Sequence, residues 1–136
     1  MIKILICDDQ SLFREALRTL LSSFDELNVI GEAANGEEAL RQAVSLSPDV
    51  VLMDLRMPRV DGVSATGQIR TRWPHIHVLV LTTYDTDADI LRSIEAGAIG
   101  YLLKDAGSEE LFQAVRTAAG GYSYLSPAVA SRLVGR

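Results

Sequence analysis

The chain has 136 residues, close to the commonest size of a single globular domain. Its 13 basic and 18 acidic residues give a net charge of −5, which disfavours direct binding of nucleic acid because phosphate contacts need clustered Lys and Arg. No stretch approaches the roughly 20 apolar residues that span a bilayer, no signal peptide precedes the first apolar run, and the single cysteine, Cys7, excludes an internal disulfide. We therefore expect one cytoplasmic domain without a membrane partner.

Apolar runs alternate with amphipathic stretches along the whole chain. Hydrophobic residues recur at helical spacing in the stretches that begin near residues 12, 39, 65, 90 and 111. Five β/α pairs in strict alternation predict an α/β domain with a parallel sheet and right-handed crossovers. The strand-like runs are rich in Val, Ile and Leu, as in strands covered on both faces, and span residues 2–7, 28–32, 49–53, 77–81 and 99–103.

Capping residues mark the ends of several predicted helices. Asn35 followed by Glu38 resembles a capping box before the second helix. Ser108 is placed to cap the fifth helix, and Gly97 stands where the fourth should stop.

The last 16 residues form a tail that follows the fifth helix. We expect 121–125 to be a short connection and Ser126-Pro127 to open a final helix over 128–134. The predicted organisation is thus a domain over 1–120 and a C-terminal helix or linker over 121–136.

Three acidic residues follow two of the predicted strands. Asp8 and Asp9 come after the first run, and Asp54 comes after the third. The carboxyl ends of parallel strands share one edge of the sheet, where ligands bind in open α/β folds. Because clustered carboxylates repel one another, this edge is expected to attract a divalent cation.

Two further polar residues end neighbouring strands. Thr82 ends the fourth run and Lys104 the fifth. Taken separately, Asp54 is typical of a turn after a strand, and Lys104 is typical of a solvent-exposed surface residue. Together with a cation site they provide a nucleophilic carboxylate, a hydrogen-bond donor and a fixed positive charge, which is the equipment of phosphoryl transfer.

Residues 52–62, Leu-Met-Asp-Leu-Arg-Met-Pro-Arg-Val-Asp-Gly, resemble the phosphoacceptor segment of bacterial response-regulator receiver domains. The resemblance extends to Asp8-Asp9, to 81–84, to 96–101 and to Lys104, and it covers residues 1–120. It implies a flavodoxin-like (βα)5 receiver fold whose five-stranded parallel sheet has the order 2-1-3-4-5, here with an extra C-terminal helix.

The resemblance also implies residue roles at the strand ends. Asp54 would accept a phosphoryl group from a sensor histidine kinase, so the domain would catalyse only its own phosphotransfer and dephosphorylation rather than act as an enzyme on other substrates. Asp9, Asp54 and the backbone carbonyl of Arg56 would hold Mg²⁺, with Asp8 acting through a metal-bound water. Lys104 would contact a phosphoryl oxygen or the free carboxylate.

A conformational switch is implied as well. Thr82 would move toward the new phosphoryl group, and Tyr101 would swing inward to fill the space that it leaves. Arg56 and Tyr84 occupy the positions two residues after the acceptor and two after the threonine; both are bulky, and we predict that they shield the acyl phosphate from water.

The residues around Lys104 are similar to the NarL/FixJ branch of the family. Many receivers carry a proline after this lysine, often with a cis bond, but here Asp105 follows, which leaves the bond geometry open. Members of the branch carry a C-terminal helix-turn-helix that binds DNA, and none lies within these 136 residues. The implied function is control of transcription through such an output domain, with homodimerisation on phosphorylation.

Three alternative functions share parts of this pattern. A standalone receiver that signals through a protein partner shares the same chemistry. A haloacid-dehalogenase-type phosphatase needs a second aspartate where Arg56 stands, and a nucleotide-binding module needs a glycine-rich loop where Asp8-Asp9-Gln10 stands.

Overall fold

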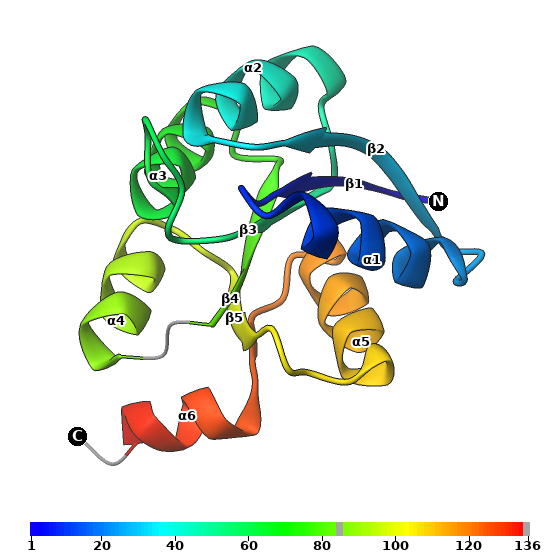
Figure 1. The fold of residues 1–136 in the computed structure, drawn as a ribbon. Helices are drawn as coiled ribbons and strands as arrows, with labels where there is room; N and C mark the ends of the chain where they lie inside the picture. The colour runs from blue at the N-terminus through cyan, green and yellow to red at the C-terminus, as the bar shows by residue number, and fades with distance from the viewer. Residues whose placement is uncertain (84–85, 135–136) are drawn as a thin grey trace.

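The computed structural model describes residues 1–83 and 86–134. Within them, six parallel strands form one sheet with the order β2-β1-β3-β4-β5-β6. Helices separate successive strands along the chain (Figure 1). The elements are β1 (Ile2–Cys7), α1 (Ser11–Ser22), β2 (Leu27–Ala33), α2 (Gly36–Leu46), β3 (Val50–Met53), α3 (Gly62–Arg72), β4 (His77–Thr82), α4 (Asp87–Glu95), β5 (Gly100–Leu103), α5 (Ser108–Ala119), β6 (Tyr124–Leu125) and α6 (Pro127–Val134).

The helices cover both faces of the sheet. In Figure 1, α1 and α5 lie on one side of the strands, and α2, α3 and α4 lie on the other. Alternate residues of β1 serve the two layers: Ile4 and Ile6 pack in the cluster with α1 and α5, whereas Leu5 and Cys7 pack in the cluster with α2 and α3. This two-sided burial explains why the strands read as continuous apolar runs.

Most of the predicted helix ends are confirmed. The side chain of Asn35 accepts a hydrogen bond from the Glu38 backbone N–H, and Glu38 in turn accepts one from the Ala34 N–H. Gly97 follows α4 with a φ of 108°, a left-handed conformation that favours glycine. The predicted cap of the fifth helix was wrong, because Ser108 is its first helical residue and Gly107 takes the cap position without a side-chain hydrogen bond.

The tail departs from the prediction in one respect. Tyr124–Leu125, expected to be part of a connection, is a sixth strand that pairs with the open edge of β5, so the order 2-1-3-4-5 is extended by one. The predicted final helix is confirmed as α6, and Ser126 Oγ accepts a hydrogen bond from the Val129 N–H.

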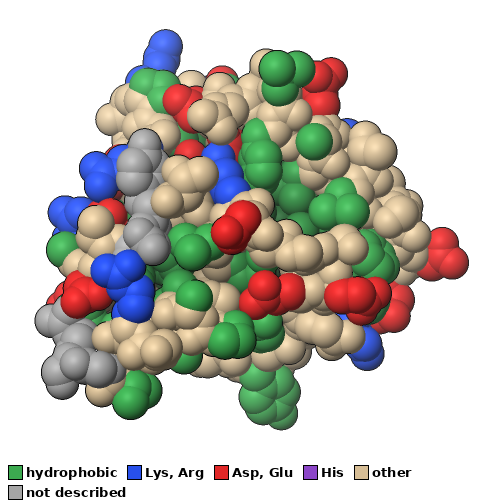
Figure 2. Space-filling view, turned by 60° about the horizontal axis from the view of Figure 1, so that its bottom comes forward, with side chains coloured by type: hydrophobic (Ala, Val, Ile, Leu, Met, Phe, Trp, Pro, Cys, Tyr) green, Lys and Arg blue, Asp and Glu red, His purple; other side chains and the backbone are tan. Residues whose placement is uncertain are grey.

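α6 packs against the domain rather than extending away from it. Val129 is fully buried in a cluster with Tyr101 and Ile90, and the guanidinium of Arg132 lies 3.2 Å from Asp87 of α4. Figure 2 shows the molecule with the α6 side turned forward, and basic and acidic side chains lie side by side at its left, toward α4 and α6.

The structure also gives the geometry of the peptide bond that the sequence left open. Among the described residues no peptide bond is cis, so the Lys104–Asp105 bond is trans. No helix in the described part of the chain is long and apolar enough to cross a bilayer.

Candidate functional site

The predicted acidic cluster forms at the carboxyl ends of β1 and β3. These strands are neighbours, with Cys7 paired to Met53, so Asp8 and Asp54 leave the sheet side by side. One carboxylate oxygen from each of Asp8, Asp9 and Asp54 lies within 4.8 Å of the others. Asp8 and Asp54 are buried and Asp9 is exposed, so the cluster opens to solvent on one side.

Lys104 completes this edge of the sheet from β5. Its Nζ lies 2.6 Å from Asp8 Oδ2 and 3.7 Å from Asp54 Oδ2. Its backbone N–H donates to the carbonyl of Thr82, which joins the ends of β4 and β5. Thr82 itself is fully buried. The ends of four strands, β1, β3, β4 and β5, thus bring Asp8, Asp54, Thr82 and Lys104 to the same edge of the sheet.

The electrostatics of Asp54 favour a bound cation. Burial raises the pKa of Asp54, and the charge of Asp8 raises it further. A hydrogen bond with Thr82 and the charge of Lys104 oppose this rise only in part. Its Oδ1 atom is buried and receives no hydrogen bond from any described residue. A cluster of carboxylate oxygens with an unsatisfied buried oxygen fits a hard divalent cation such as Mg²⁺.

Gly62 allows the loop after Asp54 to fold back closely. A Cβ at this position would lie 2.0 Å from the Asp54 carbonyl oxygen and 2.7 Å from the Leu55 Cα. The Gly62 N–H donates to the Leu55 carbonyl across this contact. The start of α3 therefore supports the backbone of the acidic residue directly.

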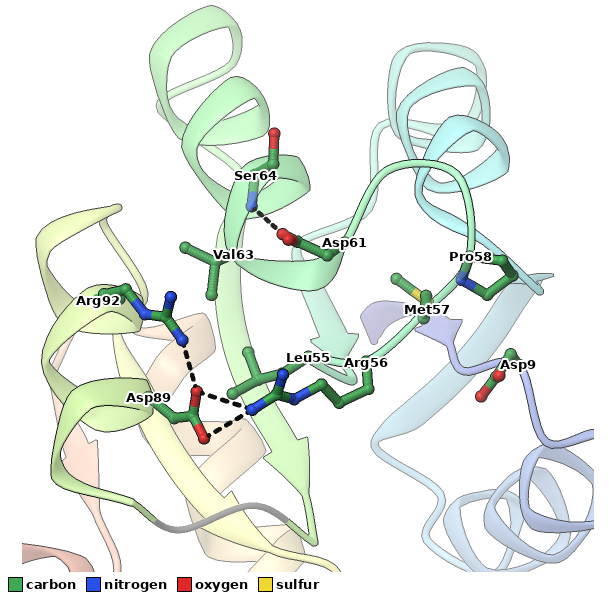
Figure 3. Close-up of a pocket in the computed structure, with 10 residues that line it drawn as sticks. All are labelled: Asp9, Leu55, Arg56, Met57, Pro58, Asp61, Val63, Ser64, Asp89 and Arg92. Atoms are coloured by element: carbon green, nitrogen blue, oxygen red, sulfur yellow. Dashed lines mark hydrogen bonds and ion pairs between the residues drawn. The ribbon is translucent and has the colours of Figure 1, made fainter.

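The side chain of Arg56, which the sequence predicts to shield the acyl phosphate, contacts α4 in this structure. It points away from Asp9 and reaches α4, where its Nη2 lies 3.2 Å from both carboxylate oxygens of Asp89 (Figure 3). Arg92 contacts the same carboxylate at 2.8 Å. Asp89 was not singled out from the sequence, because no local pattern indicates an ion pair between residues so far apart.

The two remaining predicted residues have different outcomes. Tyr101 is fully buried in this structure, among Val80, Ile90 and Val129, so its side chain is already inside. The predicted inward swing therefore does not start from an outward position here. Tyr84 lies outside the described residues.

Three residues of the β1–α1 region contribute to the site and were missed as well. Gln10 contacts Lys104 Nζ at 3.3 Å, and the ammonium also lies 4.3 Å from the centre of the Phe13 ring. Arg14 donates to the backbone carbonyl of Asp8 and to Glu32. All three lie within five residues of Asp9 along the chain, and this short distance is the signal by which their position near the site could have been found.

Comparison with known proteins agrees with this geometry. The family model of the response regulator receiver domain matches residues 4–116. Transcriptional regulatory protein LnrK of Bacillus subtilis is 45% identical over 134 residues, which are 98% of this chain and 61% of that protein. Response regulator GacA of Pseudomonas aeruginosa is 42% identical over 133 residues, with 98% and 62% covered. The chain thus spans about three fifths of the length of these relatives.

Solved structures give the same result. A LuxR-family two-component response regulator from Aurantimonas sp. superposes with a TM-score of 0.94 at 33% identity, covering 99% of this chain and 96% of that one. The signal receiver domain of the putative response regulator NarL from Mycobacterium tuberculosis superposes with a TM-score of 0.85 at 36% identity, covering 88% and 97%. The fold, the acidic edge of the sheet and these similarities lead to one conclusion: this chain belongs to the response regulator receiver domain family.

Proposed function

We propose that Asp54 is the phosphoacceptor of a two-component system and receives its phosphoryl group from a phosphohistidine on a sensor kinase. The observation that carries this proposal is the meeting of the Asp8, Asp9 and Asp54 carboxylates with the Lys104 ammonium at one edge of the sheet. A second aspartate two residues after Asp54, which a phosphatase of the haloacid-dehalogenase type needs, is replaced by Arg56.

The transfer moves one phosphoryl group between two side chains. A carboxylate oxygen of Asp54 attacks phosphorus and forms a P–O bond while the P–N bond of the phosphohistidine breaks. The electron pair of that bond stays on the imidazole nitrogen, which takes up a proton from solvent. Lys104 is placed to stabilise the charge on the phosphoryl oxygens, and Thr82 to donate a hydrogen bond to one of them.

Asp8, Asp9, Asp54 and the backbone carbonyl of Arg56 are the groups that we propose to hold Mg²⁺. The ion would neutralise the charge that gathers on the phosphoryl oxygens. Asp8 would act through a metal-bound water, and Lys104, whose Nζ lies 3.7 Å from Asp54 Oδ2, would contact a phosphoryl oxygen.

The output of the domain is proposed from its relatives. LnrK is a transcriptional regulatory protein, and by this similarity residues 1–120 are the phosphoacceptor unit while 121–136 lead toward a DNA-binding domain outside this sequence. Phosphorylation adds about −1.5 to −2 charge and three strong acceptors at Asp54. Recruitment of Thr82 and Lys104 by these acceptors would change the conformation of the α4–β5–α5 face. That change would favour homodimerisation and DNA binding by the longer protein.

Incubation with acetyl phosphate and Mg²⁺, followed by intact mass measurement, tests the phosphoacceptor directly. The wild-type chain should gain the mass of one phosphoryl group, and Asp54→Asn should gain none. Asp25→Asn, a change of an exposed aspartate remote from the cluster, is the matched control and should behave like the wild type. Equal labelling of Asp54→Asn would refute the assignment.

A further inference from the structure

Asp89 on α4 is a buried carboxylate with an unusual number of partners. Its side chain is only 2% exposed. It accepts hydrogen bonds from the Thr86 hydroxyl at 2.8 Å, from Arg92 at 2.8 Å and from Arg56 at 3.2 Å. Burial opposes ionisation, but these hydrogen bonds and the charge of Arg56 outweigh it and hold the pKa of Asp89 below its ordinary value. The carboxylate is therefore charged and fully engaged.

Arg56 connects this carboxylate to the proposed phosphoacceptor. Its backbone lies two residues after Asp54, in the loop between β3 and α3, and its side chain crosses to α4 (Figure 3). Arg56 and Asp89 both line a groove of about 650 Å³, together with Asp9, Asp61 and Arg92 among others. The pair Arg56–Asp89 is thus a direct link between the phosphoacceptor loop and α4.

The two guanidinium groups around Asp89 are not equivalent. Arg92 belongs to α4 itself, three residues away, so its contact with Asp89 joins nothing outside the helix. Arg56 comes from a different element and its side chain is 54% exposed, so it can leave Asp89 without a large change in its own hydration. If it leaves, Thr86 and Arg92 still satisfy Asp89, and no buried charge is left unpaired.

We propose that Asp89 is a positioning residue that holds Arg56 on α4, and that a phosphoryl group on Asp54 competes with Asp89 for this guanidinium. A phosphoryl group offers more negative charge than a carboxylate and the bidentate geometry that Arg prefers. Transfer of Arg56 from Asp89 to the phosphoryl group would release α4 from the loop and place a cation and a bulky side chain over the acyl phosphate. This inference rests on the proposed function of Asp54.

The lifetime of the acyl phosphate tests the competition. Asp89→Asn removes the charge that retains Arg56 but keeps an acceptor for Thr86, so the phosphorylated form should decay about two- to fivefold more slowly, the effect expected of one half-exposed ion pair. Arg56→Gln should speed the decay. In the Arg56→Gln background, Asp89→Asn should have no further effect, since the group that it releases is gone.

Arg92→Gln is the matched control. It removes a guanidinium from the same carboxylate but releases nothing near Asp54, so it should not slow the decay. A slower decay in Arg92→Gln equal to that in Asp89→Asn, or additive effects of Asp89→Asn and Arg56→Gln, would overturn the proposal.

A measurement on unphosphorylated protein separates this inference from the proposed function. In a double-mutant cycle, Arg56→Gln and Asp89→Asn should each lower the melting temperature. The double variant should lose less than the sum of the two single losses, because both changes remove the same ion pair. Additive losses would show that the ion pair does not form in solution, whether or not Asp54 is phosphorylated. A wild-type chain that takes up no phosphoryl group would instead refute the proposed function, and the competition with it.

Discussion

The ammonium of Lys104 lies 2.6 Å from Asp8 and 3.7 Å from Asp54, so the lysine pairs more closely with the first acid than with the proposed acceptor. The side chains of Lys104 and Asp8 are 9% and 3% exposed, which makes this a largely buried ion pair. A metal ion at this cluster would therefore compete with Lys104 for the same carboxylates, because the cluster already contains one cation.

Removing that cation should make the fold depend on metal. Lys104→Met leaves the buried Asp8 charge without its partner, and we expect a loss of about 3 kcal/mol in metal-free protein. Saturating MgCl₂ should raise the melting temperature of this variant more than that of the wild type. Lys3→Met, a change of the exposed lysine of β1, serves as control. An equal response to magnesium in Lys104→Met and wild type would contradict competition between the two cations.

Neutralising the acceptor should stabilise the metal-free domain. Burial and the charge of Asp8 raise the pKa of Asp54, so the ionised carboxylate is unfavourable in the folded state. Asp54→Asn should therefore raise the free energy of unfolding by about 1 kcal/mol, which is about 3–5 °C in melting temperature for a domain of this size. A differential scanning experiment in EDTA measures the shift, and an unchanged or lower melting temperature would count against crowded charges.

Two glycines of α3 should respond in opposite directions to alanine. A Cβ on Gly62 would collide with the Asp54 carbonyl oxygen at 2.0 Å, so Gly62→Ala should cost about 2 kcal/mol or more and slow phosphorylation. Gly67 has only the Ala96 Cβ at 3.9 Å nearby, so Gly67→Ala should stabilise the helix by about 0.5–1 kcal/mol. Denaturant unfolding of both variants gives the comparison. A tolerated Gly62→Ala would mean that α3 does not support the acceptor loop.

The ion pairs of Glu32 should give a pH-dependent contribution away from the acidic cluster. Burial raises the pKa of Glu32, but hydrogen bonds and charges from Arg18 and Arg14 outweigh it and bring the pKa below its ordinary value of 4.5. The ionised form therefore stabilises the fold above pH 4.5, and this contribution disappears as the pH falls through the lowered pKa.

Glu32→Gln should accordingly be less stable than the wild type by about 1 kcal/mol near pH 7. The difference should shrink steadily below pH 4.5, because the wild type loses the same charge on protonation. Unfolding curves of both proteins across this pH range measure the effect. A difference that is constant with pH would assign the loss to packing instead of charge.

The sequence pattern was sufficient for a parallel sheet and for the edge on which the site lies, whereas the strand order came from the resemblance to receiver domains. Apolar runs and their acidic ends follow the chain, and in a parallel sheet chain direction alone decides which ends meet, so Asp8, Asp54, Thr82 and Lys104 could be placed together beforehand. The strand limits differed by a residue at some ends, as for β2, which extends to Leu27 and Ala33.

What the sequence could not provide depends on tertiary contacts. The pairing of Arg56 with Asp89 joins residues 33 positions apart, and neither has a local signature of its partner. Tyr124–Leu125 is too short for a periodic pattern and becomes a strand because β5 offers it an open edge. Leu12, near which the first helical hydrophobic stretch was expected to begin, is 79% exposed, whereas Leu17 and Leu21 of α1 are buried.

The short strand β6 has a mechanical consequence. The Tyr124 N–H donates to the Ile99 carbonyl and the Ser126 N–H to the Tyr101 carbonyl, so the strand that carries Tyr101 is bonded to the residue that precedes α6. Because these bonds leave no free linker at this point, we expect a displacement of β5 to move the terminal helix as well. In a chain that continues past residue 136, a small shift of the sheet would then produce a larger movement of any domain attached to α6.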